Sequence, residues 1–198
     1  MTLANKITSG RFFVTLLFLA ALTVVALEQA RLPRERLNLL YLLSFVLFLI
    51  AAGTDWVDGY FARKYGEVTH FGRIADPFVD KIIVCGAFTY FLEIDSLRAY
   101  FPAWLVVIVL AREFLVHGIR SVAEAQGIEF GANFLGKLKL VIQTFTVGTA
   151  LWYASYLHGA LWTRWLLVVS AGATLVVTVA SGAVYVFAAR KLFASDKV

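Results

Sequence analysis

Long apolar segments dominate this chain and limit what it can fold into. The clearest runs from Phe12 to Leu27 and contains no charged residue. About 20 apolar residues make a helix long enough to cross the hydrocarbon core of a bilayer. We predict a helix for each of six such segments, at residues 9–28, 38–62, 72–93, 101–126, 136–158 and 162–189. The sequence therefore predicts an all-α, polytopic membrane protein with six transmembrane helices, forming a single domain over residues 1–198.

Composition excludes the main alternatives. The chain is 61% hydrophobic and only 16% charged, whereas soluble domains are about half apolar and a quarter charged. Its 15% aromatic content and three prolines are also unlike a disordered chain. The single cysteine, Cys85, excludes an internal disulfide and a thiolate zinc cluster. The first segment follows Lys6 and Arg11, so a signal peptide is an alternative interpretation of it.

The basic residues predict the orientation, because Lys and Arg are enriched in cytoplasmic loops. With the N-terminus inside, thirteen of the eighteen Lys and Arg residues fall on the cytoplasmic side. Three of the other five, Arg31, Arg34 and Arg36, lie in one loop. We therefore expect a multi-pass protein of the cell membrane with both termini in the cytoplasm.

Four aspartates gather where the second segment meets the third. Asp55 and Asp58 close the second segment, and Asp76 and Asp80 open the third. Since each helical residue turns by about 100°, each pair falls on one stripe of its helix. Two antiparallel helices can point these stripes at each other. The pattern predicts four carboxylates around one space at the cytoplasmic membrane surface.

Carboxylates this close together need compensating charge. A site made only of carboxylate oxygens suits hard cations, so we expect two divalent ions, Mg²⁺ or Mn²⁺. Paired metals of this kind commonly serve phosphoryl transfer, and Arg63 beside them can hold a phosphate. The alternative is that the aspartates are solvated anchors at helix ends.

The same residues carry a family resemblance. The pattern Asp-x2-Asp-Gly-x2-Ala-Arg-x8-Gly-x3-Asp-x3-Asp spans residues 55–80 with all eight fixed positions matched. It resembles the signature of the CDP-alcohol phosphatidyltransferases, a family of six-span membrane enzymes. The resemblance implies that the cations bind the pyrophosphate of a CDP-linked donor, usually CDP-diacylglycerol, and that CMP leaves.

The resemblance also assigns residue roles. One metal would be held by Asp55, Asp58 and Asp76, and the second by Asp55, Asp76 and Asp80. Asp80 also matches the general base that takes the proton of the acceptor hydroxyl. The residues that match donor-binding positions are Gly59, Ala62, Arg63 and Gly72, together with Asn5 and Thr8 of an N-terminal Asn-x2-Thr-x2-Arg block that ends at Arg11. Pro77 is expected in the first turn of its helix, where proline costs no hydrogen bond.

A second basic group, formed by Arg112, Arg120, Lys137 and Lys139, predicts an acceptor that carries phosphate. Arg112 lies inside an apolar run and requires an anion, which is Glu113, a metal-site carboxylate or a bound phosphate. Lys137 and Lys139 point about 200° apart on a helix, so we do not expect both to touch one ligand. His117 is expected to be a packing residue.

A phosphate site favours glycerol 3-phosphate or an inositol phosphate over serine or free inositol. The Arg-Glu and Gly-Lys-x-Lys patterns further resemble the bacterial branch of the family that makes phosphatidylglycerophosphate. We therefore expect CDP-diacylglycerol and glycerol 3-phosphate as substrates, in a lipid bilayer and without nucleic acid. The small residues of the sixth segment indicate close helix packing, either within the chain or at the seam of a homodimer. The alternative functions are the same chemistry with another acceptor, and an ion-coupled transporter.

Overall fold

The computed structural model describes residues 3–65, 70–126, 134–157 and 160–195, and the side chains of residues 9–54, 77–126, 134–156 and 160–190. Within these ranges the secondary structure is helical and contains no strand. The elements are α1 (Leu3–Glu28), α2 (Arg34–Tyr65), α3 (His70–Tyr90), α4 (Ala103–Ala125), α5 (Phe134–Trp152), a π-helical turn η1 (Tyr153–Leu157) and α6 (Leu161–Ser195). One long helix coincides with each of the six apolar segments, which confirms the all-α prediction.

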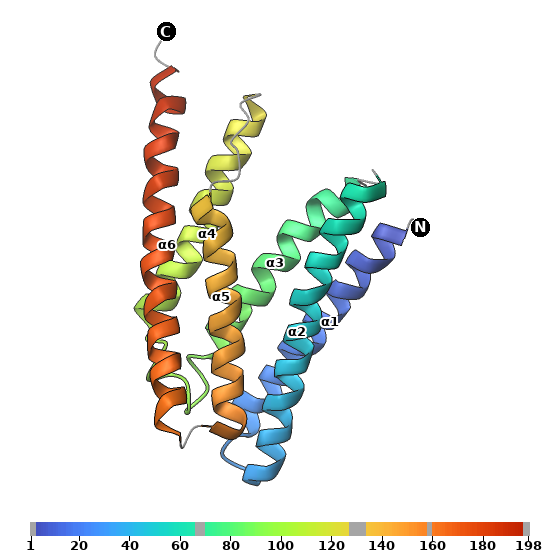
Figure 1. The fold of residues 1–198 in the computed structure, drawn as a ribbon, viewed down its shortest axis with the longest axis vertical. Coiled ribbons are helices and arrows are strands. Elements are labelled where there is room, and N and C mark those ends of the chain that lie inside the picture. The colour runs from blue at the N-terminus through green and yellow to red at the C-terminus, as the bar shows by residue number, and fades with distance from the viewer. Residues whose placement is uncertain (1–2, 66–69, 127–133, 158–159, 196–198) are drawn as a thin grey trace.

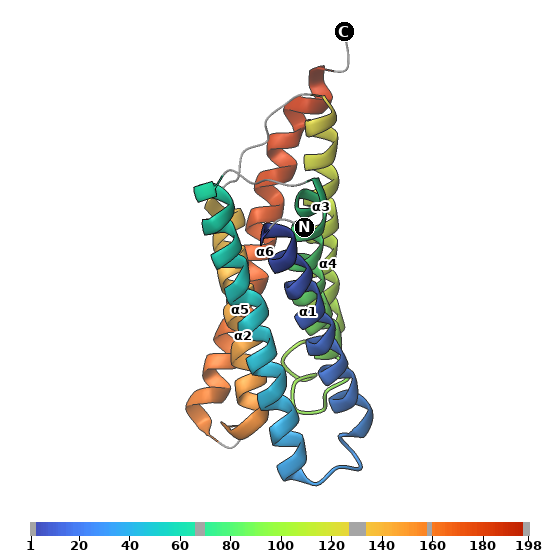
Figure 2. The same ribbon diagram turned by 90° about the vertical axis from the view of Figure 1, so that its right-hand side faces the viewer.

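The helices form two groups of three that meet along α2 and α5. Helix α1 packs against α2 and α3, while α6 packs against α4 and α5 (Figure 1). The contacts of α2 with α5 and η1, and those of α3 with α4 and α5, join the two groups. Both termini lie toward the same end of the bundle, called the upper end below (Figures 1 and 2). Each helix therefore runs opposite in direction to the one before it.

Three of the helices are long and apolar enough to span a bilayer within the described part of the chain. The three spans are Ser9–Glu28, Arg34–Thr54 and Leu161–Arg190. Helices α3, α4 and α5 carry charged residues along their length, among them Asp80 and Lys81, Arg112 and Glu113, and Lys137 and Lys139. The chain is thus a membrane protein, and several of its charged residues lie in the helices between these three apolar spans.

An aromatic cluster fills the core toward the lower end. Phe88, Phe91 and Phe101 are fully buried, and their ring centroids lie 4.8 to 5.8 Å apart. The connection between α3 and α4 folds back into this core, because Ile94 and Leu97 are also fully buried. Tilted and edge-to-face aromatic pairs add to the stabilisation that burial provides. The cluster fixes the lower ends of α3 and α4 and leaves their upper halves available for a polar site.

Pro77 differs from the sequence prediction. Helix α3 begins at His70, so Pro77 lies two turns inside the helix rather than in its first turn. A proline at such a position removes one backbone hydrogen bond and crowds the preceding turn. The expectation that it costs nothing was wrong, because the helix starts earlier than the apolar segment does.

We expect Phe88→Ala to destabilise the bundle more than the same change on its surface. Truncating a fully buried phenylalanine costs about 3 to 5 kcal/mol, which should lower the Tm of the detergent-solubilised protein by roughly 6 °C or more. The matched control is Phe114→Ala, since Phe114 is 69% exposed. Equal Tm values for the two variants would contradict a core centred on these rings.

Candidate active site

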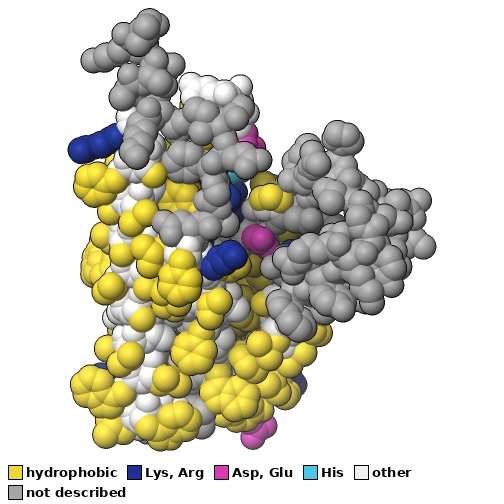
Figure 3. All heavy atoms as spheres, turned by 45° about the horizontal axis from the view of Figure 1, so that its top comes forward, with side chains coloured by type: hydrophobic (Ala, Val, Ile, Leu, Met, Phe, Trp, Pro, Cys, Tyr) yellow, Lys and Arg dark blue, Asp and Glu magenta, His cyan; other side chains and the backbone are white. Residues whose placement is uncertain are grey.

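A polar cavity of about 270 Å³ lies between α3, α4, α5 and α6. Figure 3 brings the upper end forward and shows basic and acidic side chains gathered near the middle of that face, with hydrophobic side chains around them. The charged residues that line the cavity are Asp80, Lys81, Arg112, Glu113, Arg120, Lys137 and Lys139. Five of these are cationic and two are anionic, so the cavity carries a net positive charge suited to an anion.

A buried ion cluster forms the wall between α4 and α5. The Oε1 atom of Glu113 accepts from Lys139 Nζ at 2.5 Å and from Arg112 Nη1 at 3.2 Å. All three residues are under 9% exposed. Removing charges from water is costly unless they are paired, and here one carboxylate serves two cations. Of the three anions predicted for Arg112, the structure pairs it with Glu113.

Helix α6 completes the surroundings of Arg112. The Nε atom of Arg112 donates to Ser181 Oγ at 3.1 Å, and the Arg112 guanidinium lies 5.6 Å from the centre of the Tyr185 ring. A Cβ atom at Gly182 would come within 3.3 Å of Arg112 Cγ. The small residues of the sixth segment therefore let α6 approach α4 closely at the position of this guanidinium.

Lys137 and Lys139 both line the cavity, and the expectation that one ligand does not touch both stays a prediction. Gly136 and Leu140 are also in the lining, so the centre of the exposed helix face lies between the two lysines. Around the helix axis, Lys137 lies about 100° from Gly136 in one direction and Lys139 about 60° in the other. A long, flexible lysine side chain can reach across such an angle. Lys139 is buried against Glu113, whereas Lys137 is exposed.

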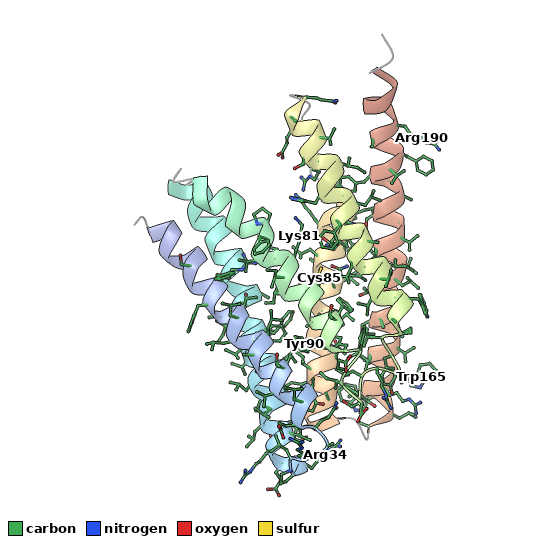
Figure 4. The ribbon with its side chains drawn as sticks, turned by 180° about the vertical axis from the view of Figure 1, so that it is seen from behind. Arg34, Lys81, Cys85, Tyr90, Trp165 and Arg190 are labelled. Atoms are coloured by element: carbon green, nitrogen blue, oxygen red, sulfur yellow. The ribbon has the colours of Figure 1, made fainter. Side chains whose placement is uncertain are left out.

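Lys81 and His117 connect α3 to α4 at the cavity. Lys81 Nζ and His117 Nδ1 are 2.9 Å apart, and both residues line the cavity. Figure 4 shows Lys81 and Cys85 one turn apart on the side of α3 that faces α4. His117 is exposed rather than packed in a core, so its prediction as a packing residue was wrong.

Asp80 is held from α1. The Nη2 atom of Arg11 forms an ion pair with Asp80 Oδ1, and Arg11 Nε donates to the Ala51 carbonyl at 3.2 Å. Arg11 is only 4% exposed. One guanidinium thus ties α1, α2 and α3 together beside the aspartate motif.

A second cavity, of about 700 Å³, has a different character. It lies mainly between α2 and α5, and its lining is largely apolar, including Phe45, Phe145 and Trp152. Asp80, Val84 and Leu140 line both this cavity and the polar one. The two cavities therefore meet beside Asp80, with charged walls on one side and apolar walls on the other.

The other predicted metal and donor residues have side chains outside the described part of the chain. The helix backbone places Asp55 and Asp58 near the end of α2, and Asp76 near the start of α3. The same limit applies to Asn5, Thr8, Gly59, Ala62, Arg63 and Gly72. Among the described side chains there is no group of three or more potential metal ligands, and Asp80 is the member of the predicted metal set that they include.

Comparison with known proteins decides the family. The profile described as CDP-alcohol phosphatidyltransferase matches residues 1–180. The chain belongs to the CDP-alcohol phosphatidyltransferase family. This match confirms the resemblance seen in the aspartate pattern, and it extends beyond that pattern to the charged residues that line the polar cavity.

Curated bacterial members of the family are similar to this chain. It is 38% identical to the CDP-diacylglycerol–glycerol-3-phosphate 3-phosphatidyltransferase of Bacillus subtilis, over 75% of this chain and 76% of the relative. It is 33% identical to the protein of the same name from Mycoplasma genitalium, over 71% of this chain and 61% of that relative. A protein of that name from Rickettsia typhi is 39% identical over 53% of this chain and 57% of the relative.

Three features of this phosphatidyltransferase site were not predicted from the sequence. The pairing of Arg11 with Asp80 joins residues 69 positions apart, and Tyr185 and Ser181 reach Arg112 from another helix. The contact of Arg112 with Glu113, in contrast, was among the predicted pairings, because the two residues are adjacent in the chain. The other contacts depend on which helix faces lie together, and no local pattern records that.

We expect inorganic phosphate to protect Cys85 from alkylation, because Cys85 is the only cysteine in the chain and lines the cationic cavity. A phosphate held by a few charge-assisted bonds should protect half-maximally at roughly millimolar concentration. Reaction with a small maleimide, followed by mass spectrometry, measures the rate.

Chloride at the same ionic strength is the control and should not protect. Arg120→Gln should raise the phosphate concentration required by roughly tenfold, since one charged hydrogen bond is lost. Alkylation that phosphate does not slow would show that the cavity does not bind this anion.

Proposed function

We propose that this protein transfers the phosphatidyl group of CDP-diacylglycerol to glycerol 3-phosphate, giving phosphatidylglycerophosphate and CMP. The proposal depends chiefly on the meeting of the two cavities at Asp80. A reaction that joins a lipid to a water-soluble anion needs an apolar surface and a cationic one beside the same reacting group. The names of the bacterial relatives support the same substrates.

The apolar cavity supports a lipid donor. Its aromatic and aliphatic lining suits acyl chains, which gain free energy by burial in proportion to apolar area. The cytidine and pyrophosphate would then lie toward the upper end, against Asn5, Thr8, Gly59, Ala62, Arg63 and Gly72. The assignments of Gly59, Ala62, Arg63 and Gly72 rest on the aspartate motif, which lies on α2 and α3. Those of Asn5 and Thr8 rest on the N-terminal block, which lies on α1.

The cationic cavity supports a phosphorylated acceptor. We assign Arg112, Arg120, Lys137 and Lys139 to its phosphate, since all four line one cavity. A guanidinium can bind phosphate through two parallel hydrogen bonds. Serine and free inositol carry no phosphate to compensate the excess positive charge. Among acceptors, glycerol 3-phosphate therefore fits better than a neutral alcohol.

We propose Asp55, Asp58, Asp76 and Asp80 as ligands of two divalent cations, Mg²⁺ or Mn²⁺, because an all-carboxylate donor set suits hard ions. When bound, such cations neutralise pyrophosphate and make the acceptor hydroxyl more acidic. Asp80 is the proposed general base, and it needs only to be ionised and within reach of the hydroxyl. The Arg11 guanidinium forms an ion pair with its Oδ1 atom.

The reaction is then a displacement at the phosphorus that bears the diacylglycerol. The acceptor hydroxyl oxygen bonds to this phosphorus, while its proton passes to the Asp80 carboxylate. The bond from the same phosphorus to the bridging pyrophosphate oxygen breaks, and CMP leaves with that oxygen. The cationic side chains of the polar cavity hold the acceptor phosphate, and this keeps the acceptor hydroxyl oriented toward the phosphorus that it attacks.

We further propose that all six helices cross the cell membrane, with the active site on the cytoplasmic side. The alternation of helix direction brings both termini to the upper end (Figure 1). The cationic cavity is lined from the first turn of α5, at Gly136 and Lys137, which suits a site near a membrane surface. The excess of Lys and Arg on that side favours the cytoplasm.

The direct test is one assay of the purified protein with labelled CDP-diacylglycerol, Mg²⁺ or Mn²⁺ and a panel of alcohols. We expect CMP release with glycerol 3-phosphate and much less with inositol, serine or inositol phosphate. The same mixture in excess chelator should release none. Release that depends on another alcohol would contradict the proposed acceptor, and release in chelator would contradict the metal assignment.

We expect Asp80→Asn to abolish turnover while donor binding persists. Loss of a general base typically lowers kcat by about 100-fold to 10,000-fold. CMP release measures the rate, and the Tm increase caused by CDP-diacylglycerol measures binding. Asp95→Asn is the matched control, because Asp95 is an exposed aspartate in the connection after α3. A near-normal rate in Asp80→Asn would exclude Asp80 as the base.

A further inference from the structure

Glu113 has one carboxylate oxygen that the ion cluster does not use. Both cations, Arg112 and Lys139, contact Oε1. The described residues provide no hydrogen-bond partner for Oε2. Nor is Oε2 among the buried polar atoms that lack a partner, so it is not sealed within the protein. Glu113 lines the polar cavity, and Oε2 is the part of its carboxylate left to accept a hydrogen bond there.

A carboxylate in this position is unsuited to bind the acceptor's phosphate, because like charges repel. Its natural partner is a hydroxyl, because a hydroxyl can donate a hydrogen bond and an ionised carboxylate can only accept one. The cavity is lined by two carboxylates, Asp80 and Glu113, and five cations. Glycerol 3-phosphate carries one phosphate and two hydroxyls. The reacting hydroxyl belongs with Asp80, which leaves the second hydroxyl for Glu113.

We propose that Glu113 is a specificity-determining residue whose Oε2 accepts a hydrogen bond from the non-reacting hydroxyl of the acceptor. The inference rests on the proposed function for the identity of that acceptor. Lys139 and Arg112 fix the carboxylate through Oε1, so Oε2 is held in place before the acceptor enters. A site that binds a substrate hydroxyl through a buried charged group discriminates against an analogue that lacks it.

The test compares glycerol 3-phosphate with 3-hydroxypropyl phosphate, which has the phosphate and the reacting hydroxyl but lacks the second one. A hydrogen bond to a charged group contributes about 1.5 to 3 kcal/mol, so wild-type kcat/KM should favour glycerol 3-phosphate by about 10-fold to 100-fold. CMP release measures both values.

The variant Glu113→Gln changes the atom in question and conserves the shape. Arg112 and Lys139 can only donate, so they should retain the amide oxygen at the position of Oε1. The amide nitrogen, a donor, then replaces Oε2. We expect the preference for glycerol 3-phosphate to fall to about threefold or less. General damage to the site lowers both rates together and leaves their ratio unchanged.

Glu124→Gln is the matched control, because Glu124 is exposed on α4 and is not in the lining of the cavity. It should retain the full preference. If Glu113→Gln does not fold, Glu113→Asp replaces it, since the shorter side chain withdraws the carboxylate from the hydroxyl and should also reduce the ratio.

The outcomes separate this inference from the proposed function. Equal use of the two compounds by the wild-type protein, or a full preference retained in Glu113→Gln, overturns the role of Glu113 and leaves the acceptor unchanged. A wild-type protein that releases CMP with neither compound overturns both. If Glu113→Gln folds but turns over too slowly, protection of Cys85 by each compound gives the same ratio from binding alone.

Discussion

The sharing of one buried carboxylate by two cations is the interaction on which the polar half of this protein depends. Glu113 and Arg112 come from α4 and Lys139 from α5, while α6 contributes Ser181 and Tyr185. Any one of these charges alone would be costly in a membrane-embedded bundle. Paired as they are, they join three helices and still leave a net positive wall. The group that stabilises the bundle thus also contributes to the positive charge of the cavity.

A second buried arginine joins the helices of the other half of the bundle. Arg11 joins α1 to Asp80 on α3 and to a carbonyl of α2. Asp80 also lines both the polar and the apolar cavity. The ion pair with Arg11 therefore fixes Asp80 at the place where the two cavities meet. The aromatic cluster at the lower end, centred on Phe88 and Phe101, provides the rigid base. Packing therefore fixes one end of the helices, and ion pairs arrange the other.

Much of this was predictable because its signals are local. Six apolar segments gave six helices, although α3 begins before its apolar segment and so places Pro77 inside the helix. The family followed from the aspartate pattern. The four basic residues assigned to the acceptor share one cavity. The expectation that one ligand does not touch both Lys137 and Lys139 stays a prediction, although a long side chain can reach farther around a helix than its backbone angle indicates. His117 was misassigned because its neighbour, Lys81, lies on another helix.

The sequence by itself determined the membrane class, the helices and the kind of chemistry, since hydropathy and motif spacing are properties of neighbouring residues. Only the tertiary structure decided which charges are paired: Arg11 with Asp80, and Arg112 and Lys139 with the same oxygen of Glu113. Two of these ion pairs join residues on different helices, and the third joins Arg112 to Glu113, its neighbour in the chain. The choice among possible partners depends on helix rotation and on how closely the helices approach, as at Gly182, where a Cβ atom would come within 3.3 Å of Arg112 Cγ. Once that choice is made, it also determines which oxygen of Glu113 remains available to a ligand.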